Sequence, residues 1–312
     1  MVQLAEYSTV YVIILLCRAV PLKAVQVISG FLGNLFYLLV KKRRNIALEN
    51  LRHAFKDTKT EQEIRDIARQ SCRSFFLTFL EIIKLGTLFK GPDTMDRLRH
   101  KAENLEQLFL KAKNIHDESG GCIFVTPHIG NWELLPYVSA TVGIPLAVVV
   151  RPLDNVYLEK LLYSNRAASG QLIIPKRNAM FVLQRTLQQG RSIGLLPDQS
   201  TMKGISVDFF GRKALTTPVP AILAITYKRP IVVVACCRRS DKQYEGFVSD
   251  PIRPALNRDG TGPGYESEKA EIFRLTQEMN HKMESIIRKY PGQYLWIHNR
   301  WKTYKDKKEL LS

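Results

Sequence analysis

The stretch that decides the fold is residues 120–135, which read Gly-Gly-Cys-Ile-Phe-Val-Thr-Pro-His-Ile-Gly-Asn-Trp-Glu-Leu-Leu. The apolar run at 122–125 follows a Gly-Gly turn, as is typical of a buried strand. Pro127 ends this strand, because proline cannot donate a hydrogen bond to a sheet ladder. Apolar residues then recur at roughly helical spacing after Glu133. We therefore expect His128 in the turn at the carboxyl end of a strand, where open α/β sheets usually bind ligands.

His128 and Glu133 are separated by four residues. A helical zinc site requires two histidines one turn apart, and this stretch contains one. Residues five apart diverge by about 140° on a straight helix, so the two side chains cooperate only if the chain turns between them, as Gly130 permits. Glu133 would then orient the imidazole and leave its other nitrogen as a base. A structural turn histidine beside a glutamate that favours the helix dipole also fits the spacing.

The composition predicts a folded and strongly basic protein. The 312 residues suffice for one large or two medium domains, and 45% of them are hydrophobic. The net charge of +17 indicates a polyanionic partner: nucleic acid, an anionic membrane surface, a phosphorylated substrate or an acidic carrier protein. Because no nucleic-acid-binding motif accompanies this charge, we expect no nucleic acid partner. The five irregularly spaced cysteines indicate small core residues in a reducing compartment.

The N-terminal residues are the most apolar part of the chain. The run at 10–17 is shorter than the ~20 residues of a full membrane span, and the run at 24–40 is near the lower limit and contains polar residues. Lys41-Lys42-Arg43-Arg44 follows directly. This arrangement is typical of a membrane anchor with its basic end at an anionic cytoplasmic surface. The alternative is a buried core helix followed by a charged turn, and no cleaved signal peptide is indicated.

The remainder predicts a helical layer that leads into alternating strands and helices. Helices are expected at 45–55, 60–85 and 98–112. Strands are then expected at 122–125, 145–150, 172–174, 192–196 and 231–237, with helices at 132–140, 155–168, 178–189, 217–227 and 267–289. Such alternation predicts an α/β fold, with a largely parallel central sheet flanked by helices.

Three of the predicted strands end in a chemically useful side chain: His128, Arg151 and Asp198. If the strands are parallel, these ends meet at one edge of the sheet. Arg151 offers planar donors to a phosphate or carboxylate, although a surface salt bridge explains it equally well. Asp198 is either a ligand-binding carboxylate or part of a Pro-Asp turn. Residues 208–218 place aromatics beside cations, which suits a pocket-lining loop or a core edge.

Several stretches, taken in order, resemble one known family. They are Asn45-Ile-Ala-Leu-Glu-Asn-Leu51, His128-Ile-Gly-Asn-Trp-Glu133, Val150-Arg-Pro152, Leu196-Pro-Asp-Gln199, Phe209-Phe-Gly211 and Trp296-Ile-His-Asn-Arg-Trp-Lys302. Together they resemble the lipid A biosynthesis acyltransferases, the lauroyl and myristoyl transferases, within the wider group that shares a His-x4-Asp/Glu motif. The last stretch is the most specific. Ser200 departs from the family, which often has aspartate there, and Asn299 stands where a second arginine is common.

The resemblance implies a glycerolipid acyltransferase-like fold in two parts. Residues 1–44 would anchor the protein, and residues 45–312 would form the acyltransferase domain, with a helical layer at 45–115 and a catalytic α/β part at 116–312. The implied reaction moves a fatty acyl chain from an acyl-carrier-protein or acyl-CoA thioester to a hydroxyl of a phosphorylated glycolipid. A lipid A precursor of the Kdo-lipid IVA type is the implied acceptor. Other acceptors, such as a phosphatidylinositol mannoside or a lysophospholipid, stay open.

The resemblance also implies roles for individual residues. His128 would be the general base and Glu133 its orienting carboxylate, with backbone N–H groups near Gly130 or the Asn131 amide as oxyanion donors. Substrate would be bound by five residues: Asn131, Arg151, Asp198, Gln199 and Arg300. Neither a metal nor a cofactor is required. Acyl carrier protein, anionic lipids and the acceptor at the cytoplasmic face of the inner membrane would account for the positive charge. A basic membrane-surface or nucleic-acid-binding protein with a structural His–Glu pair is the non-enzymatic alternative.

Overall fold

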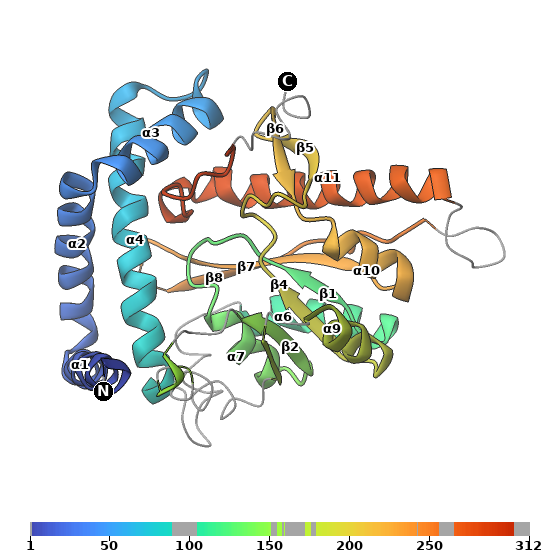
Figure 1. The fold of residues 1–312 in the computed structure, drawn as a ribbon, viewed down its shortest axis with the longest axis horizontal. Coiled ribbons are helices and arrows are strands. Elements are labelled where there is room, and N and C mark those ends of the chain that lie inside the picture. The colour runs from blue at the N-terminus through green and yellow to red at the C-terminus, as the bar shows by residue number, and fades with distance from the viewer. Residues whose placement is uncertain are drawn as a thin grey trace.

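A six-stranded sheet forms the centre of the protein in a computed structural model that describes residues 2–88, 105–150, 155–157, 159, 172–175, 179–241, 243–255 and 265–302 (Figure 1). The strand order is β3-β2-β4-β1-β7-β8. The strands are β1 (Ile123–Val125), β2 (Leu146–Val150), β3 (Leu172–Pro175), β4 (Ser192–Leu195), β7 (Ile231–Arg238) and β8 (Tyr244–Val248). All neighbours pair in parallel except β8, which is antiparallel to β7. The predicted α/β fold with a largely parallel sheet is therefore confirmed.

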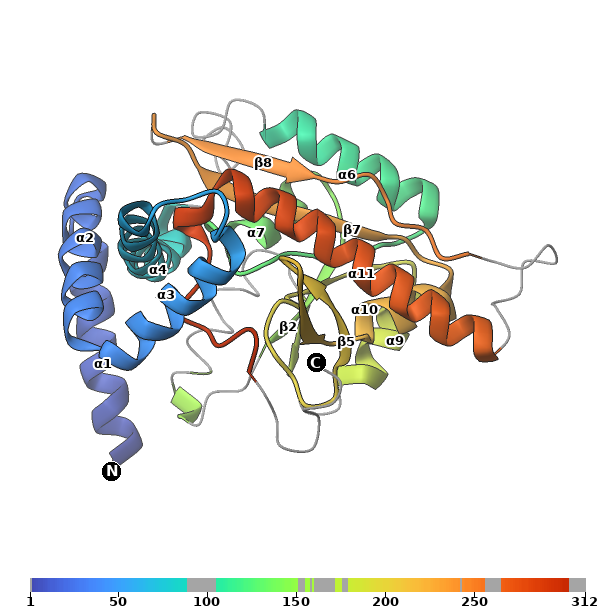
Figure 2. The same ribbon diagram turned by 90° about the horizontal axis from the view of Figure 1, so that it is seen from above.

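Helices cover both faces of this sheet, which explains why its central strands are apolar throughout. In β1, Phe124 packs with α6 (Leu105–Ser119) and α7 (Leu134–Thr141), whereas Ile123 and Val125 face the opposite cluster. That second cluster contains side chains of α9 (Ala179–Gln188), α10 (Val219–Tyr227) and α11 (Tyr265–Lys289). Figures 1 and 2 show α11 on the face opposite to α6 and α7.

The N-terminal helices form a layer beside the sheet. They are α1 (Val2–Ala19), α2 (Leu22–Leu39), α3 (Lys41–Phe55) and α4 (Glu61–Leu88). In both views α4 stands between the sheet and α2 (Figures 1 and 2). Asn50 of α3 donates from Nδ2 to the carbonyls of Trp296 and His298, at 2.9 and 2.8 Å, and Ser71 of α4 donates to the carbonyl of Tyr294. Helices α3 and α4 are thereby hydrogen-bonded to residues 294–298.

The outer helices expose many large apolar side chains. On α1 and α2 these are Leu4, Val12, Leu15, Leu16, Val27, Ile28, Phe31, Leu35, Leu38 and Leu39. Within the described residues, no single helix has both the length and the hydropathy of a membrane span. The stretches Ala24–Leu39 and Lys41–Phe55 satisfy both conditions only jointly, across a bend of 94°.

Two features were absent from the sequence prediction. Residues 205–216 form a hairpin, β5 (Ile205–Phe209) and β6 (Arg212–Thr216), and strand β8 closes one edge of the central sheet. The hairpin turn has Phe210 at φ 54° and Gly211 at φ 72°, a left-handed pair that matches the twist of the two strands. The predicted helices at 155–168 and 98–112 lie largely or partly outside the described residues.

Candidate active site

The turn that follows β1 carries His128 over the end of β7. Gly130 has φ 59°, and a Cβ atom there would lie 2.1 Å from the carbonyl oxygen of Cys236, so only glycine fits. The segment near the chain's end secures the turn from another side, because the Leu295 N–H donates to the His128 carbonyl at 3.0 Å. Ile129 and Tyr294 form an isolated antiparallel bridge. The position of His128 is therefore fixed by its backbone.

Asp198 holds His128 through both of its carboxylate oxygens. Oδ1 lies 2.6 Å from Nδ1 of the ring, and Oδ2 accepts the backbone N–H of His128 at 2.8 Å. Asp198 follows β4, which lies parallel to β1, so the predicted convergence of these two strand ends is confirmed. The carboxylate favours the tautomer that carries its proton on Nδ1 and leaves a lone pair on Nε2. An imidazole held in this way is equipped to act as a base.

The carboxylate bonded to the His128 ring is Asp198, whereas the sequence pointed to Glu133. Asp198 was interpreted as a ligand-binding or turn residue, and Glu133 as the partner of His128. In the structure Nδ1 is bonded to Asp198, because β1 and β4 are adjacent strands whose ends meet. Glu133 begins α7, and its negative charge adds to that of Asp198 near the ring. The predicted catalytic role of Glu133 stays a prediction.

Burial and charge act in opposite directions on this pair. The His128 side chain is 17% exposed and that of Asp198 is 2% exposed. Burial alone lowers the pKa of His128, but Asp198 and, to a smaller extent, Glu133 outweigh it and raise this pKa above its usual value. Burial raises the pKa of Asp198, yet the contact with His128 brings it below the ordinary aspartate value. The carboxylate is thus the charged member, and the proton exchanges on the imidazole.

Gln199 and His298 lie around the reactive side of His128. The Gln199 amide nitrogen is 3.4 Å from Nε2 of His128, and Gln199 is exposed. The His298 Nε2 accepts the backbone N–H of Ser200 at 3.3 Å, and burial lowers the pKa of His298. His298 belongs to the stretch that carried the resemblance but was not predicted as a site residue. Its position beside Ser200 follows from packing of the last segment against the end of β4.

The two oxyanion donors expected from the sequence are already engaged. The Gly130 N–H donates to the carbonyl of Gln293 at 3.2 Å, and the Asn131 N–H donates to that of Cys236 at 2.8 Å. The Asn131 side-chain amide donates to Glu81 at 2.9 Å and to the Tyr244 hydroxyl at 3.3 Å. Asn131 is also fully buried. These groups hold the turn in place in this structure, and their predicted role as oxyanion donors stays a prediction.

Two predicted substrate-binding arginines remain without a demonstrated contact to substrate. Arg300 is 1% exposed, and its guanidinium donates to the carbonyl of Leu215 at 2.8 Å and to the hydroxyl of Thr216. It joins the last segment to the β5–β6 hairpin in this structure, and its predicted contact with substrate stays a prediction. Arg151 lies outside the described residues. In the described part of the chain, no three His, Cys, Asp or Glu side chains gather as a candidate metal site.

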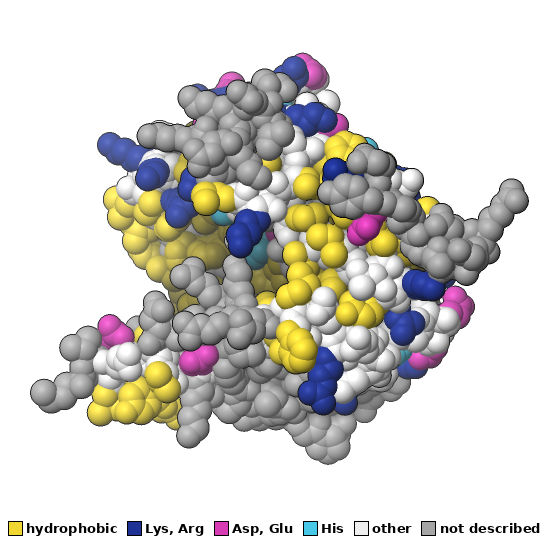
Figure 3. Space-filling model, turned by 45° about the vertical axis from the view of Figure 1, so that its right-hand side comes forward, with side chains coloured by type: hydrophobic (Ala, Val, Ile, Leu, Met, Phe, Trp, Pro, Cys, Tyr) yellow, Lys and Arg dark blue, Asp and Glu magenta, His cyan; other side chains and the backbone are white. Residues whose placement is uncertain are grey.

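An apolar cavity opens beside the turn, between the sheet and the helices α6 and α7. Its lining includes Thr126 and Trp132, which flank His128 in sequence, and the Trp132 ring packs edge-on against the imidazole at 5.2 Å between centroids. The lining also includes Ala112, Ser139 and Gly194. On the face drawn in Figure 3, hydrophobic side chains surround a hollow that also holds Lys or Arg and His side chains. Trp132 therefore connects the imidazole of His128 to an apolar cavity.

Comparison with known proteins identifies relatives over most of the chain. The chain is 26% identical over 267 residues to the lipid A biosynthesis palmitoleoyltransferase of Escherichia coli (strain K12), which covers 85% of this chain and 80% of that protein. It is 24% identical over 302 residues to a lipid A biosynthesis acyltransferase of Haemophilus influenzae, covering 95% and 87%.

A third relative carries a different name. The phosphatidylinositol mannoside acyltransferase of Mycolicibacterium smegmatis is 24% identical over 194 residues, covering 59% of this chain and 58% of that protein. The sequence model of the bacterial lipid A biosynthesis acyltransferases matches residues 2–303, nearly the whole chain. The chain therefore belongs to the bacterial lipid A biosynthesis acyltransferase family.

Proposed function

We propose that this acyltransferase works at a membrane surface and moves a fatty acyl chain from an acyl-carrier-protein thioester to a hydroxyl of a phosphorylated lipid A precursor of the Kdo-lipid IVA type. The observation that carries the proposal is the His128–Asp198 pair, whose Nε2 is left as an acceptor beside an apolar cavity. A base for a hydroxyl and a chamber for a hydrocarbon chain are the two elements that acyl transfer requires.

The reaction follows from the geometry of this pair. Nε2 of His128 takes the proton of the acceptor hydroxyl while the hydroxyl oxygen forms a bond to the thioester carbonyl carbon. Asp198 stabilises the imidazolium that results, since both of its oxygens already contact His128. The tetrahedral intermediate then breaks its carbon–sulfur bond. The thiolate leaves with the proton from Nε2, which yields an ester, a free carrier thiol and the neutral base.

Gln199 is our candidate for the oxyanion donor. Its amide nitrogen lies 3.4 Å from Nε2 of His128, and its side chain is exposed at the reactive side of the ring. In this structure the amide contacts the base itself, and the arriving hydroxyl would displace it toward the thioester oxygen. A donor aimed at the developing negative charge is worth about 10²–10³ in kcat in acyl-transfer enzymes. The donors near Gly130 are engaged with the protein and cannot serve without rearrangement.

The apolar cavity is our candidate for the acyl-chain site. It begins at Trp132, whose ring contacts His128, and continues between α6 and α7. A thioester carbonyl near Nε2 would therefore direct its hydrocarbon tail inward. Gly194 lies in the wall, and a Cβ there would come within 3.1 Å of the Val148 side chain. Bulk added at Gly194 or Ala112 is expected to shorten the preferred acyl chain.

Membrane association is supported by the outer face of α1 and α2. Exposed apolar side chains on these helices are followed by four cations, Lys41 to Arg44, in the first turn of α3. Such a pairing of apolar area with cations suits an anionic membrane surface. Arg43 also donates to the carbonyl of Ile297 at 3.2 Å, one residue before His298. Cations thus extend from this surface toward the site, where acceptor phosphates or an acidic carrier would meet them.

Other phosphorylated glycolipids remain candidate acceptors, because one relative bears the name of a phosphatidylinositol mannoside acyltransferase. We place the reaction at the cytoplasmic face of the inner membrane. Lipids extracted from cells with and without the protein, compared by mass spectrometry, would identify the acceptor. An unchanged acyl pattern of lipid A would count against the first choice.

The central test is H128A, assayed with acyl carrier protein thioester and lipid IVA-type acceptor in detergent or vesicles. We expect acyl transfer to fall by about 10³ or more, since both proton transfers use this ring. His281, a surface histidine that contacts Gln277 on α11, supplies the matched control H281A. Unchanged transfer by folded H128A would refute the enzymatic proposal. Circular dichroism and vesicle binding establish that the variant is folded.

A further inference from the structure

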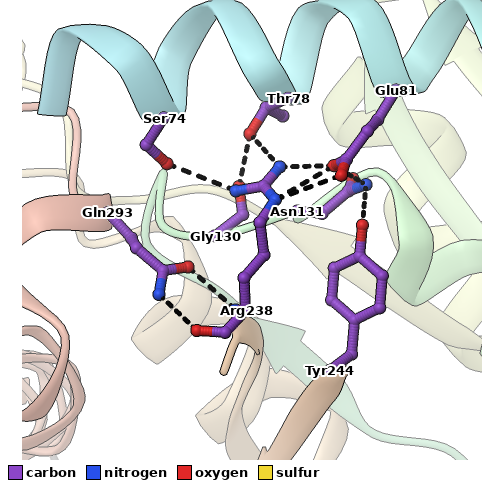
Figure 4. Close-up of polar contacts among 8 residues, drawn as sticks. All are labelled: Ser74, Thr78, Glu81, Gly130, Asn131, Arg238, Tyr244 and Gln293. Carbon is purple, nitrogen blue, oxygen red and sulfur yellow. Dashed lines mark hydrogen bonds and ion pairs between the residues drawn. The ribbon is translucent and has the colours of Figure 1, made fainter. Parts of the chain in front are cut away.

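A second charged pair contacts the turn at residues 130 and 131 (Figure 4). Arg238, at the end of β7, donates from Nε to Glu81 Oε2 at 3.1 Å and from Nη2 to the same oxygen at 2.5 Å. Glu81 belongs to α4, and the two side chains are 13% and 17% exposed. The mechanism described above uses neither residue.

The pair is hydrogen-bonded to Asn131 directly and to Gly130 through Thr78. The Thr78 hydroxyl donates to the Gly130 carbonyl at 2.6 Å and accepts a hydrogen bond from Arg238 Nη2 at 2.7 Å. Glu81 Oε2 accepts from the Asn131 amide at 2.9 Å. Figure 4 shows these side chains converging on the turn from α4 and from the end of β7. One ion pair therefore fixes the carbonyl of Gly130 and the side chain of Asn131.

The side chain of Gln293 is hydrogen-bonded to the backbone of this arginine. Its side-chain oxygen accepts the Arg238 backbone N–H at 2.9 Å, and its amide donates to the Arg238 carbonyl at 2.7 Å. Its own backbone carbonyl accepts the N–H of Gly130 at 3.2 Å. The end of β7, the last segment and the turn are thus joined in one network.

Stability alone does not account for such a network. A buried ion pair often contributes little net stability, because desolvation of both charges offsets their attraction. The bonds of this pair are instead directed at the two residues that decide where His128 sits. A displacement of about 1 Å at a reacting group can cost about 10² in rate, so precise placement has a large functional value.

We infer that the Arg238–Glu81 pair, acting through Thr78 and Asn131, is a positioning device for the turn that carries the base. This inference deepens the proposed function and rests on it for its kinetic test. Because Glu81 and Thr78 belong to α4, which packs against α1 and α2, the device also ties the base to the helices that expose the apolar face. Arg238, Glu81 and Thr78 are assigned no contact with substrate.

The sharpest test removes one hydroxyl. T78V deletes the bond to the Gly130 carbonyl while keeping the side-chain shape, and T78S restores the hydroxyl. T276V is the matched control, because Thr276 is a buried helical threonine whose hydroxyl bonds only to Ile272 within its own helix. We expect T78V to lower kcat about tenfold with KM for the acceptor within about twofold, and T78S and T276V to retain near wild-type kcat.

A readout without substrate separates failure of this inference from failure of the proposed function. In the full-length protein in detergent, NMR of the His128 ring reports the Nδ1 proton. This is the proton that His128 donates in its hydrogen bond to Asp198. We expect T78V and E81Q to shift or broaden this signal, and T276V to leave it unchanged. If wild-type protein transfers no acyl group, the proposed function fails while the NMR comparison still decides the positioning role.

Two results would overturn the inference. One is a T78V enzyme whose kcat and His128 signal match those of T276V. The other is a loss of kcat that equals the loss of folded protein measured by thermal unfolding, since that would make the network merely structural. A T78V enzyme with wild-type unfolding temperature, reduced kcat and an altered ring signal would support it.

Discussion

Two carboxylates hold the same turn from opposite sides. Asp198 contacts the imidazole and backbone N–H of His128, whereas Glu81 reaches the turn through Asn131 and is paired with Arg238. The cation that faces Asp198 is the titrating group itself, so this carboxylate adjusts how strongly the base holds its proton. The cation that faces Glu81 keeps its charge throughout the physiological pH range, so this carboxylate sets geometry only. Proton affinity and placement are therefore controlled from separate sites.

D198N should disrupt the contact between Asp198 and His128, and we expect it to have the largest effect on kcat. The backbone N–H of His128 needs an acceptor, so the amide oxygen would face it and the NH2 group would face Nδ1. That arrangement favours the tautomer with its proton on Nε2, which cannot accept a proton, and we expect kcat to fall about 10³–10⁴-fold. Asp208, whose side chain is 43% exposed and pairs with Lys213, provides the control D208N. Near wild-type kcat in D198N would contradict the assigned partner.

The pH dependence sharpens the same point. Asp198 raises the pKa of His128, so the acid limb of kcat for the wild-type enzyme should lie above the ordinary histidine pKa of about 6.5. Loss of this charge should move the limb of the residual D198N activity to lower pH. Stability follows the opposite sign for the carboxylate. The lowered pKa of Asp198 contributes stability above the unfolded aspartate pKa, and this contribution is lost as the pH falls through the folded value.

G130A should disturb both sides together. The new Cβ would meet the Cys236 carbonyl oxygen at 2.1 Å, and φ of 59° is unfavourable for alanine. We expect a loss of about 2–4 kcal/mol in the free energy of unfolding and at least tenfold in kcat. Gly211 offers the control, because it has φ 72° with open space around its Cβ position. G211A should cost about 1 kcal/mol and leave kcat intact. Equal effects in the two variants would show that the close approach is unimportant.

E81Q should weaken the Glu81–Arg238 pair that holds the turn, without altering the proton affinity of His128. The amide keeps the shape of the carboxylate but removes the charge that Arg238 contacts, and we expect kcat to fall about tenfold. The acid limb of the pH profile should stay where it is in the wild-type enzyme. Stopped assays across the pH range test this pattern against that of D198N. A shifted acid limb in E81Q would show that Glu81 also controls the proton affinity of His128, and it would contradict the separation of the two roles.

E133Q tests the smaller of the two charge effects on the pKa of His128. Glu133 is the second of the two carboxylates that raise the pKa of His128, after Asp198. We expect the limb to move to lower pH by less than in D198N, with a smaller loss of kcat at its plateau. The comparison also tests the role first expected for Glu133. If E133Q were the more damaging substitution, Glu133 would be the decisive partner.

The local signals in the sequence were sufficient for β1 and its turn. Four apolar residues behind Gly-Gly, stopped by Pro127, define a buried strand without reference to other parts of the chain. The β5–β6 hairpin lacked such a signal, since its turn uses Phe210 in a left-handed conformation that is rare for a bulky residue. Strand β8 is short and partly buried at an edge of the sheet, so its alternation is weak.

The partnership of His128 with Asp198 depended on strand order, which periodicity does not reveal. The two residues meet because β1 and β4 are neighbours, although 70 positions separate them. Glu81 and Arg238 are 157 positions apart, and a glutamate on an amphipathic helix is ordinarily a solvated residue. The sequence could supply the candidates for both pairs but not the contacts, because these arise from tertiary packing.

The bonds of the last described segment have a consequence for folding. Leu295 and Tyr294 hold the turn that carries His128. Asn50 of α3 and Ser71 of α4 donate hydrogen bonds to carbonyls of the same segment. Contacts so distant in sequence form late and slow folding. The framework around His128 therefore forms only after residues 294–298 have packed against α3 and α4.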